Sequence, residues 1–292
     1  MTIKKIRTII IYYIVWIFYF GIRVDAFDMK RIESRNNPTI KNMNTLRDKR
    51  ERESNRRFYF EGVHLLEEYL RAGKTPSCIF VREDVLDRYS ELIDSAGCEI
   101  IEVTDSVYEK LTEEKAPQGI FTVSDFLDNV RFVTDSDFAK DIDGNSVMLV
   151  DMQDNGNVGT VVRTAAAMDC DVILCGKCAD VYSPKTVRAT MGALFTNRVY
   201  VCADASLAVK SLQKNGKRIL ASALDENAVR LGGFSVEKGD CFAVGNEGQG
   251  LSDEFISLCD MTVYIPMSKK TESLNAASAA SMLMWEAKRS ER

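Results

Sequence analysis

The chain of 292 residues is long enough for two compact domains. Its apolar share of 46 % and charged share of 28 % are those of a globular protein, and it contains no internal repeat or low-complexity tract. A net charge of −5 gives no global sign of a nucleic-acid partner, so residues that bind RNA must be clustered. Eight scattered cysteines form no disulfide framework and indicate a reducing, cytoplasmic compartment.

Residues 1–28 differ in composition from the rest of the chain. A basic start is followed by the uncharged stretch 8–22, which is shorter than the roughly 20 residues that a membrane helix needs. The stretch resembles the apolar core of a signal peptide, but no A-x-A-type cleavage site follows it. Ile, Tyr, Phe and Lys dominate, as in translated AT-rich DNA. We therefore rank a mis-set start, with Met29 as the true first residue, above a membrane anchor.

Residues 29–57 form a basic segment. They carry ten Lys or Arg side chains against four acids, a net charge of +6. A solvated helix accounts for this pattern as well as a phosphate-contacting arm does, since RNA affinity comes largely from such charges. The sequence leaves both interpretations open.

Residues 58–125 are predicted to form a small α/β domain. A short strand leads into a helix with Val63, Leu66 and Leu70 at helical spacing. Apolar strands then alternate with helices up to the closing strand "QGIFTVSDF", which predicts a mainly parallel sheet. The acidic residues 126–145 are expected to link this domain to the next.

Residues 146–292 are predicted to form a second α/β domain with a parallel sheet. The buried strand "SVMLVDMQ" leads through a turn into a helix that starts near Val158, with Asn157 as its N-cap. A later helix carries Lys185 and Arg188 three residues apart on one face. The chain ends in "SLNAASAASMLMWEAKRSER", a helix whose small residues allow close packing.

A glycine loop, "GNEGQG", follows the apolar strand "CFAV". Gly245, Gly248 and Gly250 surround Glu247, and the G-x-x-G-x-G spacing matches neither a phosphate-binding P-loop nor a dinucleotide fingerprint. His64 is the only histidine and is expected to be an exposed helical residue, so the second domain has no Ser-His or Cys-His pair. The lone "CGKC" lacks a second metal-binding half or a redox context.

Three stretches together carry a family resemblance. "DNGNVGTVVRTA", "FAVGNEGQGLSDE" and "IPMSKKTESLNAASAASMLMWEAKR" resemble the three motifs of the SpoU/TrmH family of RNA 2′-O-ribose methyltransferases, in the SPOUT superfamily. The first domain is similar to the family's substrate-binding domain, so the resemblance spans residues 29–292. Asn155 stands where the family commonly has proline. The resemblance implies a trefoil-knotted second domain.

The resemblance also implies S-adenosylmethionine as cofactor. Gly245, Ile265, Met267 and Leu274 would line its pocket, and no metal is implied. Glycines permit a close backbone approach, and a sulfonium cation tolerates a nearby acid. Glu247 would hold the knot and the catalytic loop by hydrogen bonds rather than act as a base.

Five residues would carry the chemistry by the same analogy: Asn157, Arg163, Glu247, Ser273 and Asn275. Arg163 has been cast as the base in such enzymes, but a guanidinium stays protonated to very high pH. A bidentate grip on the flanking phosphate is the easier chemistry for it. Asn157 would orient the arginine or the ribose, and Ser273 and Asn275 would brace the site.

The partners implied are RNA and a second copy of the chain. Lys185 and Arg188 are candidate phosphate contacts, rRNA is favoured over tRNA as substrate, and a membrane is not expected. The family's homodimers pair through the knotted domain, and the terminal helix is either such an interface or intrachain core. The alternative functions are a catalytically inactive RNA-binding or ribosome-assembly protein, a membrane-anchored protein, and the same enzyme class acting on tRNA.

Overall fold

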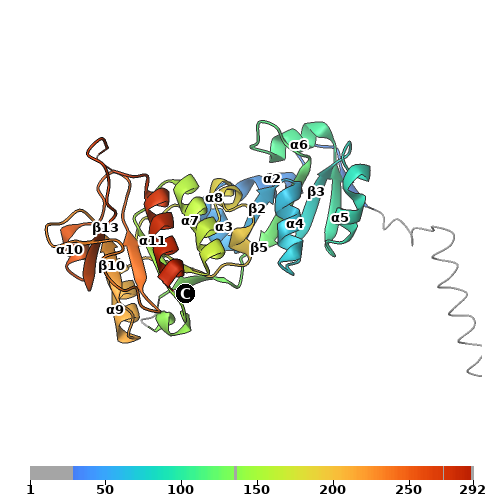
Figure 1. Ribbon diagram of the computed structural model, residues 1–292. Coiled ribbons are helices and arrows are strands. Elements are labelled where there is room, and N and C mark those ends of the chain that lie inside the picture. Colours follow the sequence, from blue (N-terminus) through green and yellow to red (C-terminus); the bar gives the residue numbers. More distant parts are fainter. Residues whose placement is uncertain (1–28, 135–136, 272, 291–292) are drawn as a thin grey trace, which may run out of the picture.

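The computed structural model describes residues 29–134, 137–271 and 273–290 (Figure 1). The leader predicted at residues 1–28 lies outside the described residues. Two α/β units lie side by side, with the C-terminal unit at the left of Figure 1 and the N-terminal unit at the right. Within the described ranges, no helix combines the length and the apolarity needed to span a bilayer.

The N-terminal unit contains a five-stranded sheet in the order β1-β4-β3-β5-β2. β1, β3 and β4 are parallel to one another, whereas β5 runs antiparallel to both β3 and β2. The strands β1, β2, β3 and β4 therefore point in one direction, as expected for a mainly parallel sheet, and only β5 departs from the expectation. It is reversed because the chain enters β5 from the end of the sheet at which β4 finished. The strands are β1 (Lys30–Ile32), β2 (Arg57–Glu61), β3 (Cys78–Arg82), β4 (Glu99–Val103) and β5 (Ile120–Asp125).

The basic residues 29–57 are built into this unit, since β1 is an edge strand of its sheet and the helices α2 and α3 follow. Asn37 begins α2 by accepting a hydrogen bond from the Thr39 amide, and Pro38 suits the first helical position. The helices are α2 (Pro38–Thr45), α3 (Lys49–Asn55), α4 (Val63–Arg71), α5 (Ser90–Asp94) and α6 (Asp105–Leu111).

The C-terminal unit contains an eight-stranded sheet in the order β11-β13-β10-β12-β7-β8-β9-β6. Every pairing in it is parallel, as predicted. The stretch 126–145, expected to be a linker, contributes the edge strand β6. The strands are β6 (Val130–Val133), β7 (Ser146–Val150), β8 (Asp171–Cys175), β9 (Val199–Cys202), β10 (Ile219–Ser222), β11 (Val229–Arg230), β12 (Cys241–Val244) and β13 (Met261–Tyr264).

Helix α7 begins three residues before the predicted start. Its N-cap is Asp154, whose carboxylate accepts a hydrogen bond from the Asn157 amide at 2.7 Å. The prediction of Asn157 as N-cap is therefore wrong, and its side chain is free for another use. The helices are α7 (Asn155–Met168), α8 (Pro184–Ala189), α9 (Ala205–Lys214), α10 (Asp253–Ile256) and α11 (Ala276–Ser290).

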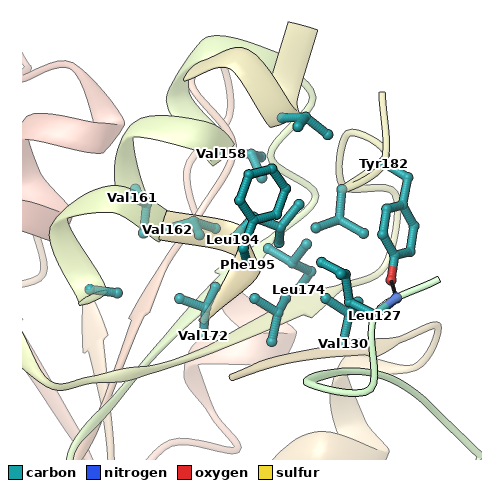
Figure 2. Close-up of a cluster of buried hydrophobic side chains, with 14 of the residues drawn as sticks. Leu127, Val130, Val158, Val161, Val162, Val172, Leu174, Tyr182, Leu194 and Phe195 are labelled. Atoms are coloured by element: carbon teal, nitrogen blue, oxygen red, sulfur yellow. Dashed lines mark hydrogen bonds between the residues drawn. The ribbon is translucent and has the colours of Figure 1, made fainter. Parts of the chain in front are cut away.

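One hydrophobic core runs through both units. Valines of α7 pack with Leu194 and Phe195, and the Leu127 amide donates to the Tyr182 hydroxyl at 2.7 Å (Figure 2). The ring of Phe58, on β2 of the N-terminal unit, packs against that of Tyr182, with the ring centroids 4.7 Å apart. The aromatic rings thus fix the two units against each other.

A buried ion pair also joins the units. Arg52 of α3 is 4 % exposed and donates to the Asp180 carboxylate at 2.5 and 3.1 Å. Its remaining donor group binds the carbonyl oxygens of Leu46 and Arg47. The guanidinium is therefore fully engaged between the two units.

Candidate active site

A cavity of about 490 Å³ opens at the carboxyl ends of β10, β12 and β13. Parallel α/β sheets bind ligands at this edge, because the loops that leave the strands meet there. The glycine loop 245–250 forms one wall, and another is formed by Tyr264, Ile265, Met267, Ser273 and Leu274. The cavity is lined by all four residues predicted to bind the cofactor: Gly245, Ile265, Met267 and Leu274.

The charges around the cavity suit a cationic nucleoside cofactor. Glu247 and Asp253 are its charged lining residues, and both are acids. Ile265 and Leu274 add apolar surface beside the backbone of the loops. S-adenosylmethionine fits these lining residues. The acids can face its sulfonium cation, and the apolar side chains can contact the flat face of its adenine. A triphosphate does not fit, because no lysine or arginine lines the cavity within the described residues.

Two glycines allow the ends of the loop to come together. A side chain on Gly245 would lie 2.2 Å from the Gly250 carbonyl carbon, so the loop closes on itself there. Gly250 has φ of +70°, which favours glycine. Asn246 completes the turn, because its side chain accepts from the Gly248 amide and donates to the Asp151 carbonyl. The missing side chain of Gly245 thus makes room for Gly250, while Gly245 itself still lines the cavity.

Glu247 of this cavity belongs to a set of three side chains, one from each motif, that are joined by hydrogen bonds. The Asn157 amide nitrogen donates to the Glu247 carboxylate at 2.9 Å. The Asn275 amide nitrogen donates to the Asn157 side-chain oxygen at 3.0 Å. We call this set the amide relay (Asn157, Glu247 and Asn275). It connects α7 to the glycine loop and to the start of α11.

Hydrogen bonds to the backbone hold Asn157 and Asn275 in place. Asp154 fixes the first turn of α7, and with it Asn157. The Asn275 side-chain oxygen accepts from the Ser278 amide at 3.1 Å, so Asn275 caps α11. Ser273 lines the cavity two residues earlier, and its carbonyl accepts from the Thr271 hydroxyl. Of the five predicted catalytic residues, Glu247 and Ser273 therefore line the cavity, and Asn157 and Asn275 are joined to Glu247 by hydrogen bonds.

Arg163 lies apart from the other four predicted catalytic residues. It is exposed on α7 and lines a second hollow, whose opposite wall is helix α4 of the N-terminal unit. Within the residues that the structure describes, Arg163 forms no hydrogen bond or ion pair. Its guanidinium is therefore available to a ligand, as a phosphate-gripping role requires.

The two candidate phosphate contacts on α8 differ in their surroundings. Lys185 is exposed, whereas Arg188 forms an ion pair with Glu114 of the N-terminal unit. Because Glu114 already neutralises part of the Arg188 charge, Lys185 is the better candidate for a contact with an RNA phosphate.

Two residues with clear contacts were missed by sequence reasoning. Asn155, in the place of the usual proline, accepts a hydrogen bond from Thr186 of α8 at 2.9 Å and so ties α8 to α7. Asn246 holds the glycine loop, and an asparagine between glycines is itself a turn signal.

The parallel sheet, its edge cavity and the acidic lining are those of an α/β protein that can bind a cationic nucleoside cofactor. Comparison with known proteins gives the family. Residues 144–285 match the model of the SpoU rRNA Methylase family, and residues 37–122 match the MRM3-like substrate binding domain. The chain belongs to the SpoU rRNA methylase family.

Relatives and solved structures agree with this assignment. The 23S rRNA (guanosine(2553)-2′-O)-methyltransferase RlmP of Bacillus subtilis is 30 % identical over 261 residues, covering 88 % of this chain and 98 % of that protein. A 23S rRNA (uridine(2479)-2′-O)-methyltransferase of Streptomyces viridochromogenes is 37 % identical over 139 residues, covering 46 % and 48 %. The structure of an AdoMet-bound rRNA methyltransferase from Sinorhizobium meliloti has a TM-score of 0.77 at 26 % identity, covering 89 % and 97 %. The predicted family, two-domain α/β fold and S-adenosylmethionine cofactor are confirmed.

Proposed function

We propose that this protein transfers a methyl group from S-adenosylmethionine to the 2′-hydroxyl of a ribose in rRNA. The observation that carries the proposal is the amide relay, which joins all three motifs through Glu247, a lining residue of the acidic cavity. Family membership supports the reaction class. The names of the Bacillus and Streptomyces relatives support 23S rRNA as the substrate.

The cavity residues serve to bind and orient. When bound, S-adenosylmethionine supplies a methyl group on a sulfonium cation, whose charge Glu247 and Asp253 favour. The cofactor would supply this methyl group to the 2′-oxygen and leave as a neutral thioether, and the hydroxyl proton would pass to the flanking phosphate or to water. Holding the hydroxyl in line with the methyl group is the main task of the protein.

Asn157 has one N–H group left for the substrate. A primary amide carries two N–H donors and one acceptor oxygen. One N–H of Asn157 donates to the Glu247 carboxylate, and the Asn157 oxygen accepts from the Asn275 amide. The second N–H of Asn157 can therefore donate to a ribose oxygen. Glu247 then acts as a positioning residue that fixes the rotamer of Asn157.

Arg163 grips the phosphate beside the target ribose. A guanidinium cation serves as a hydrogen-bond donor and not as the base that takes the hydroxyl proton. That proton passes to the phosphate or to water. Ser273 braces the loop that carries Leu274 and Asn275 into the site.

A homodimer and a knotted second domain complete the proposal. On α11, Ala277, Ala280 and Met284 are buried within the chain, whereas Met282 and Trp285 are 43 % and 52 % exposed. These two exposed apolar side chains support an interface with a second copy. A Trp285→Lys substitution should convert the dimer to a monomer in sedimentation equilibrium. An unchanged mass would refute this interface.

Cytoplasm is the compartment we propose for this reaction. All eight cysteines are free thiols, which suits a reducing environment.

The test of the function uses the full chain, labelled S-adenosylmethionine and total RNA from a strain that lacks the gene. Digestion and mass spectrometry should reveal one new 2′-O-methylnucleoside in 23S rRNA, absent with the Asn157→Ala variant. A modified nucleoside in tRNA instead would reassign the substrate. Cofactor and RNA binding without transfer to free or ribosomal rRNA would favour the non-enzymatic RNA-binding protein.

A further inference from the structure

A second hollow, of about 260 Å³, lies between the two units and belongs to neither domain alone. One wall is α4 of the N-terminal unit, which contributes Glu68 and Arg71. The other is formed by Arg163 of α7 and by the turn 190–193. We call it the interdomain hollow.

The walls of the interdomain hollow are fixed before any ligand binds. Tyr69, on the inner face of α4, packs edge-on against Phe195 with ring centroids 4.9 Å apart. Gly192 lies so close to α4 that a side chain there would be 2.5 Å from the Glu68 Cβ atom. The hollow is therefore a preformed feature of the domain junction.

Two arginines from different domains face this space. Arg163 forms no ion pair within the described residues, and Arg71 pairs only with Glu68, one turn away on the same helix. The Arg71 side chain is 70 % exposed, so an incoming anion can reach it. Arg71, Arg163 and Glu68 together carry a net positive charge, which suits the binding of a single phosphate.

The rim of the hollow carries an exposed apolar residue in an uncommon backbone conformation. Met191 has φ of +50° and is 43 % exposed. A residue with a side chain is uncommon in this region of backbone space. The turn presents a flexible, polarisable thioether beside the two arginines, and such a surface packs well on the flat face of a base.

We propose that the interdomain hollow binds a single-stranded RNA nucleotide that neighbours the methylated one. Arg71 and Arg163 hold its phosphate, and Met191 packs on its base. This rests on the proposed function. Arg163 lies six residues beyond Asn157 on α7, about 9 Å along the helix axis. Adjacent nucleotides of one RNA strand can span that distance.

Arg71 and Glu68 give the test a pair of substitutions with opposite expected effects. Binding of a short fluorescein-labelled single-stranded RNA is measured by anisotropy over a range of KCl concentrations. Arg71→Gln should weaken binding by about tenfold, because a charge-assisted hydrogen bond is lost. It should also reduce the slope of log affinity against log salt by about 0.7, the loss of one phosphate contact. Glu68→Gln, which frees Arg71, should tighten binding.

The matched control is Arg131→Gln. Arg131 is also an exposed arginine paired with an acid, Asp141, but it lies outside the basic segment 29–57 and does not line the hollow. The substitution should leave both the affinity and the salt slope unchanged. Equal effects of Arg71→Gln and Arg131→Gln, or weaker RNA binding by the Glu68→Gln variant, would overturn the proposal.

The readout separates this proposal from the proposed function. RNA binding is measured without methyl transfer, and cofactor binding by calorimetry should be unaffected in all three variants. Active wild-type enzyme with an unaltered Arg71→Gln salt slope would refute only the role of the hollow. Opposite shifts for Arg71→Gln and Glu68→Gln in a chain without transferase activity would refute only the methyltransferase function.

Discussion

Asn157 is the residue at which the three motifs meet. Its side chain donates one hydrogen bond to Glu247 and accepts one from Asn275, so two other segments of the chain determine its orientation. Buried or half-buried amides with several partners are sensitive to the loss of any one of them.

Exchanging the amide of Asn157 and the carboxylate of Glu247 should distinguish the role of this hydrogen bond in holding the loop from the role of Asn157 as a donor to the ribose. Asn157→Asp places a second carboxylate beside Glu247, and like-charge repulsion should open the glycine loop and weaken cofactor binding by about tenfold. Adding Glu247→Gln restores a donor–acceptor pair, and Asn275 can still donate. The double variant should regain cofactor binding in calorimetry but remain without methyl transfer, because no N–H is left for the ribose.

Asn55→Ala is the control for this exchange. Its amide also bonds to a glutamate residue, Glu51, but on the exposed face of α3. Cofactor binding and methyl transfer should both stay at the wild-type level. Recovered methyl transfer in the double variant would contradict the donor role of Asn157.

Met191 should show a trade-off between stability and RNA binding. Asparagine tolerates left-handed backbone better than methionine does, so Met191→Asn should stabilise the fold by roughly 1 kcal/mol and raise the melting temperature. It should also weaken RNA binding. Met191→Ala keeps the strained conformation and removes the side chain. It should lose RNA affinity without the gain in stability, and a stability gain equal to that of Met191→Asn would argue against backbone strain.

At the scale of elements, α7 and α8 form a tightly packed pair that carries the site. Gly159 lies at their crossing, where an added Cβ atom would be 2.4 Å from the Ala189 Cβ atom and 2.8 Å from the Thr186 carbonyl oxygen. Thr186 also donates to Asn155. The position of Lys185 relative to Asn157 therefore depends on this contact.

Gly159→Ala should destabilise the protein by about 1–3 kcal/mol, as overpacking does, and should displace α8. Unfolding in urea gives the free energy, and the displacement should also reduce methyl transfer. Gly144→Ala is the control, since the nearest atom to its added Cβ would be 3.7 Å away. Similar losses from both substitutions would show that the helix crossing is not the cause.

At the scale of the whole molecule, the two units share one core and one buried ion pair. Removal of a buried partner leaves an unpaired charge and costs about 3–5 kcal/mol. Arg52→Ala should therefore lower the free energy of unfolding by that amount, with Asp180 left unpaired. Arg52→Lys should not restore it, because a single ammonium cannot replace a guanidinium that bonds Asp180 and two carbonyl oxygens.

The same measurement tests how the units are coupled. If the shared core joins them as described, urea unfolding should show one transition for both units. Arg57→Ala is the control, because the Arg57 pair with Asp125 is exposed and lies within one sheet. It should cost less than about 1 kcal/mol. Two separate transitions in the wild-type protein would contradict a continuous core.

Much of the fold was predictable because its signals are local. The apolar runs of the second domain predicted its buried parallel strands, and Ser252 before two acids predicted the start of α10. The antiparallel β5 was not predictable, since strand direction depends on which end of the sheet the chain re-enters. The N-cap of α7 was misplaced because Asp154 and Asn157 are both good caps.

The sequence by itself determined the family, the cofactor and the presence of three motifs, because each motif is a short run whose chemistry can be read locally. Only the tertiary structure decided which members of the motifs touch. Glu247 and Asn275 lie 90 and 118 residues from Asn157, and yet both bond to it. Arg163 lies six residues from Asn157 and faces another hollow. Contacts between distant residues follow from how a sheet orders its strands, and that order is a property of the whole packed core.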